Sequence, residues 1–128
     1  MQYEEFLNKV QDRIGSARPD EARRAITATF STLCERISVG EASDLADQLP
    51  QELKEPLHRA GEEAEEFSFE EFLRRVGERE GVNTDVARDH ASVVMMVLGE
   101  AVTAGELDDV RAQLPGEFDT LFQYGRQS

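Results

Sequence analysis

The chain has 128 residues and a formal net charge of −13, from 27 acidic and 14 basic side chains. This length corresponds to one domain, or to two very small units that share a core, because a unit of about 60 residues buries too little surface to be stable alone. A negative field of this size repels phosphate backbones and anionic lipid headgroups, so neither nucleic acids nor membranes are expected as partners.

The first predicted element is an amphipathic helix close to the N-terminus. Gly15 follows it and is suited to the left-handed conformation that ends a helix. Pro19, with acidic residues directly after it, predicts the start of a second helix, which residues 38–40 end. The first helix has apolar side chains at helical spacing: Tyr3, Phe6, Leu7, Val10 and Ile14.

Two shorter elements are predicted to complete the first half of the chain. A third helix places Leu45 and Leu49 inward. Pro50 then ends this pattern and begins a fourth segment, residues 51–55. Pro56 would remove a hydrogen bond from a helix interior, so the fourth segment is expected to be short or kinked.

The same order of elements then recurs. Ser68 and Glu71 have the spacing of a capping box, which predicts a helix start, and Phe69–Leu73 repeats the pattern of Tyr3–Leu7. An eleven-residue motif also occurs twice, at an offset of 65 residues, with six identities. The identical pairs are Gly40/Gly105, Glu41/Glu106, Asp44/Asp109, Gln48/Gln113, Leu49/Leu114 and Pro50/Pro115.

No stretch shows the two-residue alternation of a half-buried strand. The sequence therefore predicts an all-α fold of two tandem four-helix repeats, residues 1–60 and 67–126. The repeats are expected to pack as one bundle about a pseudo-twofold axis and to form a single compact domain, because two such small units need a shared core.

The second helix of the second repeat, expected from Asp85 to Val102, is apolar over more than one face. A helix of this kind is buried on most sides, which makes it the central helix of the bundle. It either packs on the second helix of the first repeat or offers a surface to another chain, and the internal arrangement is the preferred alternative.

Two paired motifs point to a known family. Tyr/Phe-Glu-Glu-Phe-Leu opens each repeat, and Gly-Glu-x-x-Asp leads to Gln-Leu-Pro-x-Glu in 40–52 and in 105–117. Together they resemble the domain-of-unknown-function family 2267, a bacterial and archaeal group of small helical proteins. The resemblance covers residues 2–124. It implies a duplicated all-helical domain without an established activity, and it supplies no catalytic residues.

The residues indicate no catalytic, cofactor-binding or metal site. Glu55 and His58 have the Glu-x-x-His spacing of di-iron bundles, but such sites need a second motif, and Pro56 undermines the helix. His90 is expected to face solvent or to cap a helix. Neighbouring acid pairs are assigned to solvated faces, because adjacent residues on a helix point about 100° apart. Cys34 is expected to be buried as a small apolar residue.

The repeated Gln-Leu-Pro motif has two interpretations. In the structural one, the leucines fill the bundle, the prolines turn the chain, and the glutamines bind an exposed backbone end. In the functional one, both motifs lie on one surface and form a twofold groove for an apolar peptide or a partner helix. The structural interpretation is preferred, and the candidate partner-binding residues are Gln48, Leu49, Pro50, Gln113, Leu114 and Pro115.

The function predicted from the sequence is that of a non-enzymatic protein-interaction or regulatory module in the cytoplasm. Its partner would be another protein or a second copy of the chain, and no cofactor is expected. The alternative is a carboxylate-based or metal-dependent enzyme that uses a cleft between the repeats. The acidic excess and the preference for Arg over Lys (two lysines) fit either adaptation to high salt or a GC-rich genome.

Overall fold

The computed structural model describes residues 1–57 and 63–122. Within these ranges the regular structure is helical and contains no strand, which confirms the all-α class. None of the described helices is both long and apolar enough to cross a membrane. The elements are α1 (Tyr3–Ile14), α2 (Pro19–Arg36), α3 (Val39–Asp47), α4 (Gln51–Lys54), η1 (Glu55–Leu57), α5 (Phe69–Glu80), α6 (Thr84–Ala101), α7 (Ala104–Ala112) and η2 (Gly116–Phe122).

Local sequence signals account for the ends of these helices. Gly15 and Gly81 end α1 and α5 in the left-handed conformation, with φ of 73° and 81°. Pro19 occupies the first turn of α2, as predicted. At Glu55, directly before Pro56, the chain changes from α4 to the 3₁₀ turn η1, which confirms that the fourth segment is short.

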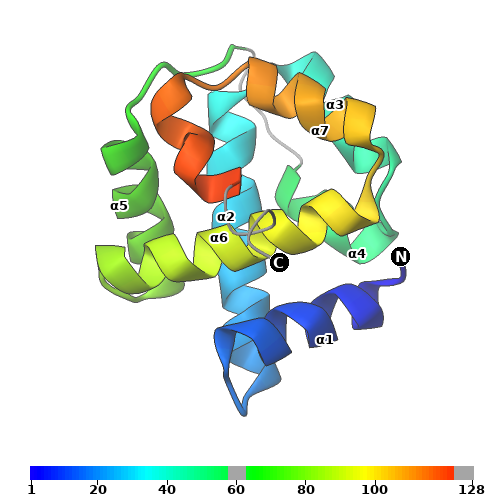
Figure 1. Ribbon diagram of the computed structural model, residues 1–128, viewed down its shortest axis with the longest axis vertical. Coiled ribbons are helices and arrows are strands. Elements are labelled where there is room, and N and C mark those ends of the chain that lie inside the picture. Colours follow the sequence, from blue (N-terminus) through cyan, green and yellow to red (C-terminus); the bar gives the residue numbers. More distant parts are fainter. Residues whose placement is uncertain (58–62, 123–128) are drawn as a thin grey trace.

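The helices pack across the two halves of the sequence. α1 contacts α6 as well as its neighbour α2, and α5 contacts α2 as well as α6. η1 lies against α2, and η2 lies against α6. Figure 1 shows α6 crossing α2 near the middle of the molecule. One hydrophobic core therefore contains side chains from both halves.

The apolar helix α6 is covered from several sides within the chain. It packs against α1, α2, α5 and η2. Val93, which lies outside the expected apolar stripe, is only 8% exposed, and Met95 is fully buried. The structure thus favours the internal position for this helix. The predicted repeat ends at residues 60 and 126 lie outside the described residues.

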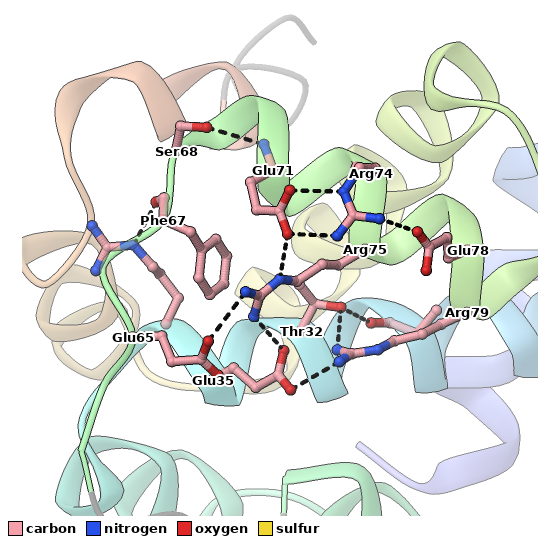
Figure 2. Close-up of polar contacts among 12 residues, drawn as sticks. Thr32, Glu35, Glu65, Phe67, Ser68, Glu71, Arg74, Arg75, Glu78 and Arg79 are labelled. Carbon is pink, nitrogen blue, oxygen red and sulfur yellow. Dashed lines mark hydrogen bonds and ion pairs between the residues drawn. The ribbon is translucent and has the colours of Figure 1, made fainter.

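A network of charged side chains joins α2 to α5 (Figure 2). Arg75 on α5 donates to Glu35 on α2 at 3.1 Å, to Glu71 at 2.8 Å and to Glu65 at 3.1 Å. Its guanidinium carbon lies 4.0 Å from the centre of the Phe67 ring. The segment that leads into α5 is thereby held against the end of α2, so the network fixes how the two halves meet.

Gly77 marks a close approach of the backbone at the end of α5. A Cβ atom added there would lie 2.8 Å from the carbonyl oxygen of Val82. We expect Gly77→Ala to destabilise the protein by about 1 to 2 kcal/mol, because the clash is with backbone and outweighs the better helix propensity of alanine. Gly40→Ala is the matched control, since its Cβ would meet no atom within 4 Å. Urea unfolding followed by circular dichroism should show no loss for the control. Equal stabilities of the two variants would contradict the close approach.

Candidate functional site

The two copies of the eleven-residue motif meet where α3 contacts α7. Figure 1 shows these helices side by side at one end of the molecule. We call the region formed by residues 38–48 and 103–113 the α3/α7 interface. Ser38 is the N-cap of α3, and Thr103 is the N-cap of α7.

A glutamine from each motif binds the helix start of the other motif. The Gln113 Oε1 atom accepts a hydrogen bond from the Ser38 backbone N–H at 2.7 Å, and its Nε2 donates to the Ser38 hydroxyl at 3.2 Å. In the same way, Gln48 accepts from the Thr103 N–H at 2.8 Å and donates to its hydroxyl at 3.3 Å. The two helix starts are therefore capped reciprocally.

Because of these glutamine caps, the side chains of Glu41 and Glu106 do not cap their own helices. Ser38 and Thr103 accept hydrogen bonds from the backbone N–H groups of Glu41 and Glu106, at 3.1 and 3.2 Å. In a capping box, the glutamate side chain at this position would bind the N–H of the N-cap residue. Here the glutamine of the opposite motif accepts that hydrogen bond. The carboxylates of Glu41 and Glu106 are left to face other groups.

The released carboxylates converge with a third. One carboxylate oxygen from each of Glu41, Glu106 and Asp109 lies within 4.8 Å of the other two. Glu106 is 8% exposed. The Oε2 atoms of Glu106 and Glu41 are both buried, and neither accepts a hydrogen bond from an N–H or hydroxyl group of the described residues. We call these three residues the carboxylate cluster.

Burial and like charge make the cluster a site of raised proton affinity. Desolvation, followed by the hydrogen bond with Glu41 and the negative charges of Glu41, Asp44 and Asp109, raises the pKa of Glu106 to about 7. Both glutamates lie in the first turn of a helix, where the helix dipole offsets part of their charge. Chemically, such a group of oxygens can share a proton or coordinate a hard cation.

The residues of the predicted partner-binding surface lie around this interface. Leu49 is buried, whereas Pro50, Leu114 and Pro115 are half-buried. Gln48 and Gln113 have exposed side chains, but their amides form the reciprocal caps. The glutamines bind backbone ends as the structural interpretation expects. Partner binding by these six residues stays a prediction.

The carboxylate cluster was not predicted from the sequence. Only acids adjacent in the sequence were compared, and Glu41 is 65 residues from Glu106. The signal that indicates the site is their equivalent position in the two motif copies, which lie on the contacting helices α3 and α7. Asp109 belongs to the same motif, three residues after Glu106.

The prediction for His90 is wrong, and His58 lies outside the described residues. Instead of facing solvent or capping a helix, the His90 side chain is 14% exposed and its Nδ1 atom pairs with Glu80 Oε2. α6 packs against α5, and this contact buries His90 beside the buried Glu80. Cys34 is buried, as predicted.

The His90 pair predicts a pH-dependent contribution to stability. The hydrogen bond to Glu80 raises the pKa of His90, burial lowers it, and Glu21 and Asp89 raise it further. The contribution is complete below the ordinary pKa of 6.5 and is lost as the pH rises through the raised value. His90→Gln keeps a donor but not the charge. We expect it to cost about 1 kcal/mol at pH 5.5 and less at pH 9. Urea unfolding at both pH values measures this, and an equal loss at both would contradict it.

The reciprocal caps predict a similar loss of stability for substitutions at two glutamines that are 65 residues apart in the sequence. Gln48→Ala and Gln113→Ala should each destabilise the protein by about 1 kcal/mol, because each leaves one N-cap N–H and hydroxyl without its partner. Gln51→Ala is the control, since this side chain is exposed and lies in the first turn of α4. Thermal unfolding should show both losses and no change for the control. A neutral result for both cap variants would refute the reciprocal arrangement.

Comparison with known proteins agrees with the motif resemblance. The sequence profile of the family described as "Uncharacterized conserved protein (DUF2267)" matches residues 3–121. No curated protein matches the chain. Because the profile spans nearly all of the sequence, including both motif copies and the α3/α7 interface, the chain belongs to the DUF2267 family.

Proposed function

We propose that the chain is a non-enzymatic interaction or regulatory module, built from two copies of one helical unit that pack about a pseudo-twofold axis. Two observations support the duplication. Helices of 12, 18 and 9 residues occur in the same order in both halves. Contacts across the halves are also reciprocal, since α1 contacts α6 while α5 contacts α2.

The α3/α7 interface carries the functional part of the proposal. Its exposed residues include several carboxylates and one large apolar side chain, Val39, which is 43% exposed. No other large hydrophobic side chain among the described residues is classed as exposed. An acidic surface with an apolar contact point fits a protein partner with a basic, partly apolar segment. The exposed acids are Asp44, Asp47, Asp108 and Asp109.

This choice of partner is more consistent with the charges than a homodimer through the same face. Two such acidic surfaces would repel one another when brought together, and like-charge contacts across an interface are costly. The reciprocal glutamine caps support the proposal in a second way, because they hold α3 and α7 in a fixed relative position. A rigid, prearranged surface loses little conformational freedom on binding.

Affinity capture with matched variants tests the proposal. The chain, the variant Asp44→Asn/Asp47→Asn/Asp108→Asn and a control are each used to capture proteins from native lysate. The control, Glu4→Gln/Asp12→Asn/Glu70→Gln, removes the same number of exposed acids from α1 and α5. Proteins that the chain and the control retain, and that the interface variant loses, are the expected result. Identical capture by all three would reject the α3/α7 interface as the binding surface.

A metal-dependent enzyme is the second candidate function, and the carboxylate cluster is the observation that favours it. Catalytic metal sites keep a coordination position open for water or substrate, and two of the three cluster carboxylates are not fully buried. A screen of ester and phosphoester hydrolysis with Mg²⁺ and Mn²⁺ tests this candidate. Activity that Glu106→Gln abolishes and Glu70→Gln preserves would support it over the binding module.

A further inference from the structure

We propose that Glu41, Glu106 and Asp109 bind one divalent cation of the oxygen-preferring class, Mg²⁺ or Ca²⁺, between α3 and α7. The cation would join the two copies of the repeated motif through their equivalent glutamates. This site is a property of the chain alone and does not depend on the partner proposed above.

The spacing of the carboxylates fits such an ion. Two ligands on opposite sides of a metal are separated by twice the metal–oxygen distance, which is about 4.0 to 4.2 Å for Mg²⁺ and about 4.6 to 5.2 Å for Ca²⁺. Neighbouring ligands lie closer together. The three oxygens of the carboxylate cluster lie within 4.8 Å of one another. They are therefore close enough to contact one Ca²⁺ ion as they stand, whereas Mg²⁺ would draw the carboxylates a few tenths of an ångström closer.

The buried oxygens give an independent reason to expect a ligand. Glu106 is more than nine-tenths buried, and its Oε2 atom accepts no hydrogen bond from an N–H or hydroxyl group of the described residues. Glu41 is half-buried: its Oε1 atom accepts a hydrogen bond from Gln113 Nε2 at 3.4 Å, whereas its buried Oε2 atom accepts none from the described residues. An unsatisfied buried acceptor destabilises the folded chain, and a charged one does so more strongly. A cation between the two glutamates would satisfy both oxygens and remove their repulsion.

The donor atoms of the carboxylate cluster favour an oxygen-preferring cation over zinc. All three donors are carboxylate oxygens, which hard cations prefer, whereas zinc sites are built mainly from Cys and His. Asp44 adds negative charge beside the cluster. Glu106 is buried, Glu41 is half-buried and Asp109 is exposed, so an ion can enter from the side of Asp109 and keep water on its remaining positions.

Binding would tighten the α3/α7 interface. The reciprocal caps already hold the helix starts together, but the cluster opposes this contact through like charge. A cation coordinated by carboxylates from both helices would neutralise their repulsion, so α3 and α7 would separate less readily. Ion binding would raise the stability of the chain in proportion to the logarithm of the ion concentration above the dissociation constant.

Isothermal titration calorimetry on the chelator-treated full chain tests the proposal, with MgCl₂ or CaCl₂ as titrant in 0.2 M KCl. The salt screens diffuse attraction to the acidic surface. We expect one ion per chain for at least one of these metals. Glu41→Gln and Glu106→Gln should each weaken binding by tenfold or more while keeping the shape of the side chain.

The control is Glu4→Gln/Glu70→Gln, because these exposed acids also occupy equivalent positions on α1 and α5. Unchanged affinity in this control, together with the loss in the cluster variants, supports the site. Absence of saturable binding overturns the proposal, as does equal weakening in all variants, which would reveal diffuse attraction only. If the cluster variants lose the ion but still capture the same partner proteins, the proposed function stands without the ion site. If the chain binds the ion but the capture experiment rejects the α3/α7 interface, the ion site stands without the proposed function.

Discussion

Phe118→Ala is expected to lower the free energy of unfolding by about 3 to 5 kcal/mol, the largest effect predicted for a single substitution. The Phe118 ring is fully buried and lies edge-on to Phe69 and Phe72, with ring centres 5.3 and 5.5 Å apart. The guanidinium carbon of Arg36, on α2, lies 5.6 Å from the Phe118 ring centre. Alanine would leave a cavity between η2 and α5 and remove one of the two aromatic rings beside the Arg36 guanidinium, leaving Phe67.

Urea unfolding followed by circular dichroism at 222 nm measures this loss. Phe118→Leu is the control, because it keeps much of the buried volume and should cost about 1 to 2 kcal/mol. The two variants should therefore differ by roughly 2 kcal/mol. A loss below about 1 kcal/mol for Phe118→Ala would mean that η2 does not close the core as described.

Glu106→Gln is expected to stabilise the protein by roughly 3 kcal/mol at pH 8 and to have little effect at pH 5, in the absence of divalent cations. The pKa of Glu106 is raised from 4.5 to about 7, mainly by burial and then by Glu41. The folded state therefore binds a proton more tightly than the unfolded state, and the wild type loses stability as the pH rises from about 4.5 to about 7. Glutamine does not titrate, and one pKa unit corresponds to about 1.4 kcal/mol.

Thermal and urea unfolding of both proteins in EDTA, from pH 5 to pH 8, measure this difference. The amide of the introduced glutamine would also donate a hydrogen bond to the Glu41 carboxylate, which strengthens the gain. Glu70→Gln is the control, since Glu70 is exposed and lies outside the carboxylate cluster, so this variant should show no such gain. A Glu106→Gln variant that is less stable than the wild type at pH 8 would show that the two glutamates do not repel one another.

Local signals made most of the fold predictable. Gly15 and Gly81 end their helices because glycine adopts positive φ without strain, and this preference is visible in the sequence. Pro56 removes a backbone donor wherever it stands, so the short fourth segment followed from one residue. The all-α class followed from apolar spacing in helix after helix.

Contacts between residues distant in the sequence were harder to predict. The pairing of His90 with Glu80 depends on how α6 lies on α5, and no local pattern shows this geometry. The carboxylate cluster needs both the reciprocal glutamine caps and the contact of α3 with α7. In the sequence, Glu41 and Glu106 are recognisable only as equivalent positions of a repeated motif. Such positions indicate a site only when the fold brings the two copies together.

The central claim is that each half of the chain completes the core of the other, as the contacts of α1 with α6 and of α5 with α2 describe. Thermal unfolding of the separate segments 1–57 and 63–128, followed by circular dichroism, tests it most directly. We predict that neither segment alone shows a cooperative transition, whereas the full chain shows a single one. A cooperative transition in either isolated segment would contradict the claim.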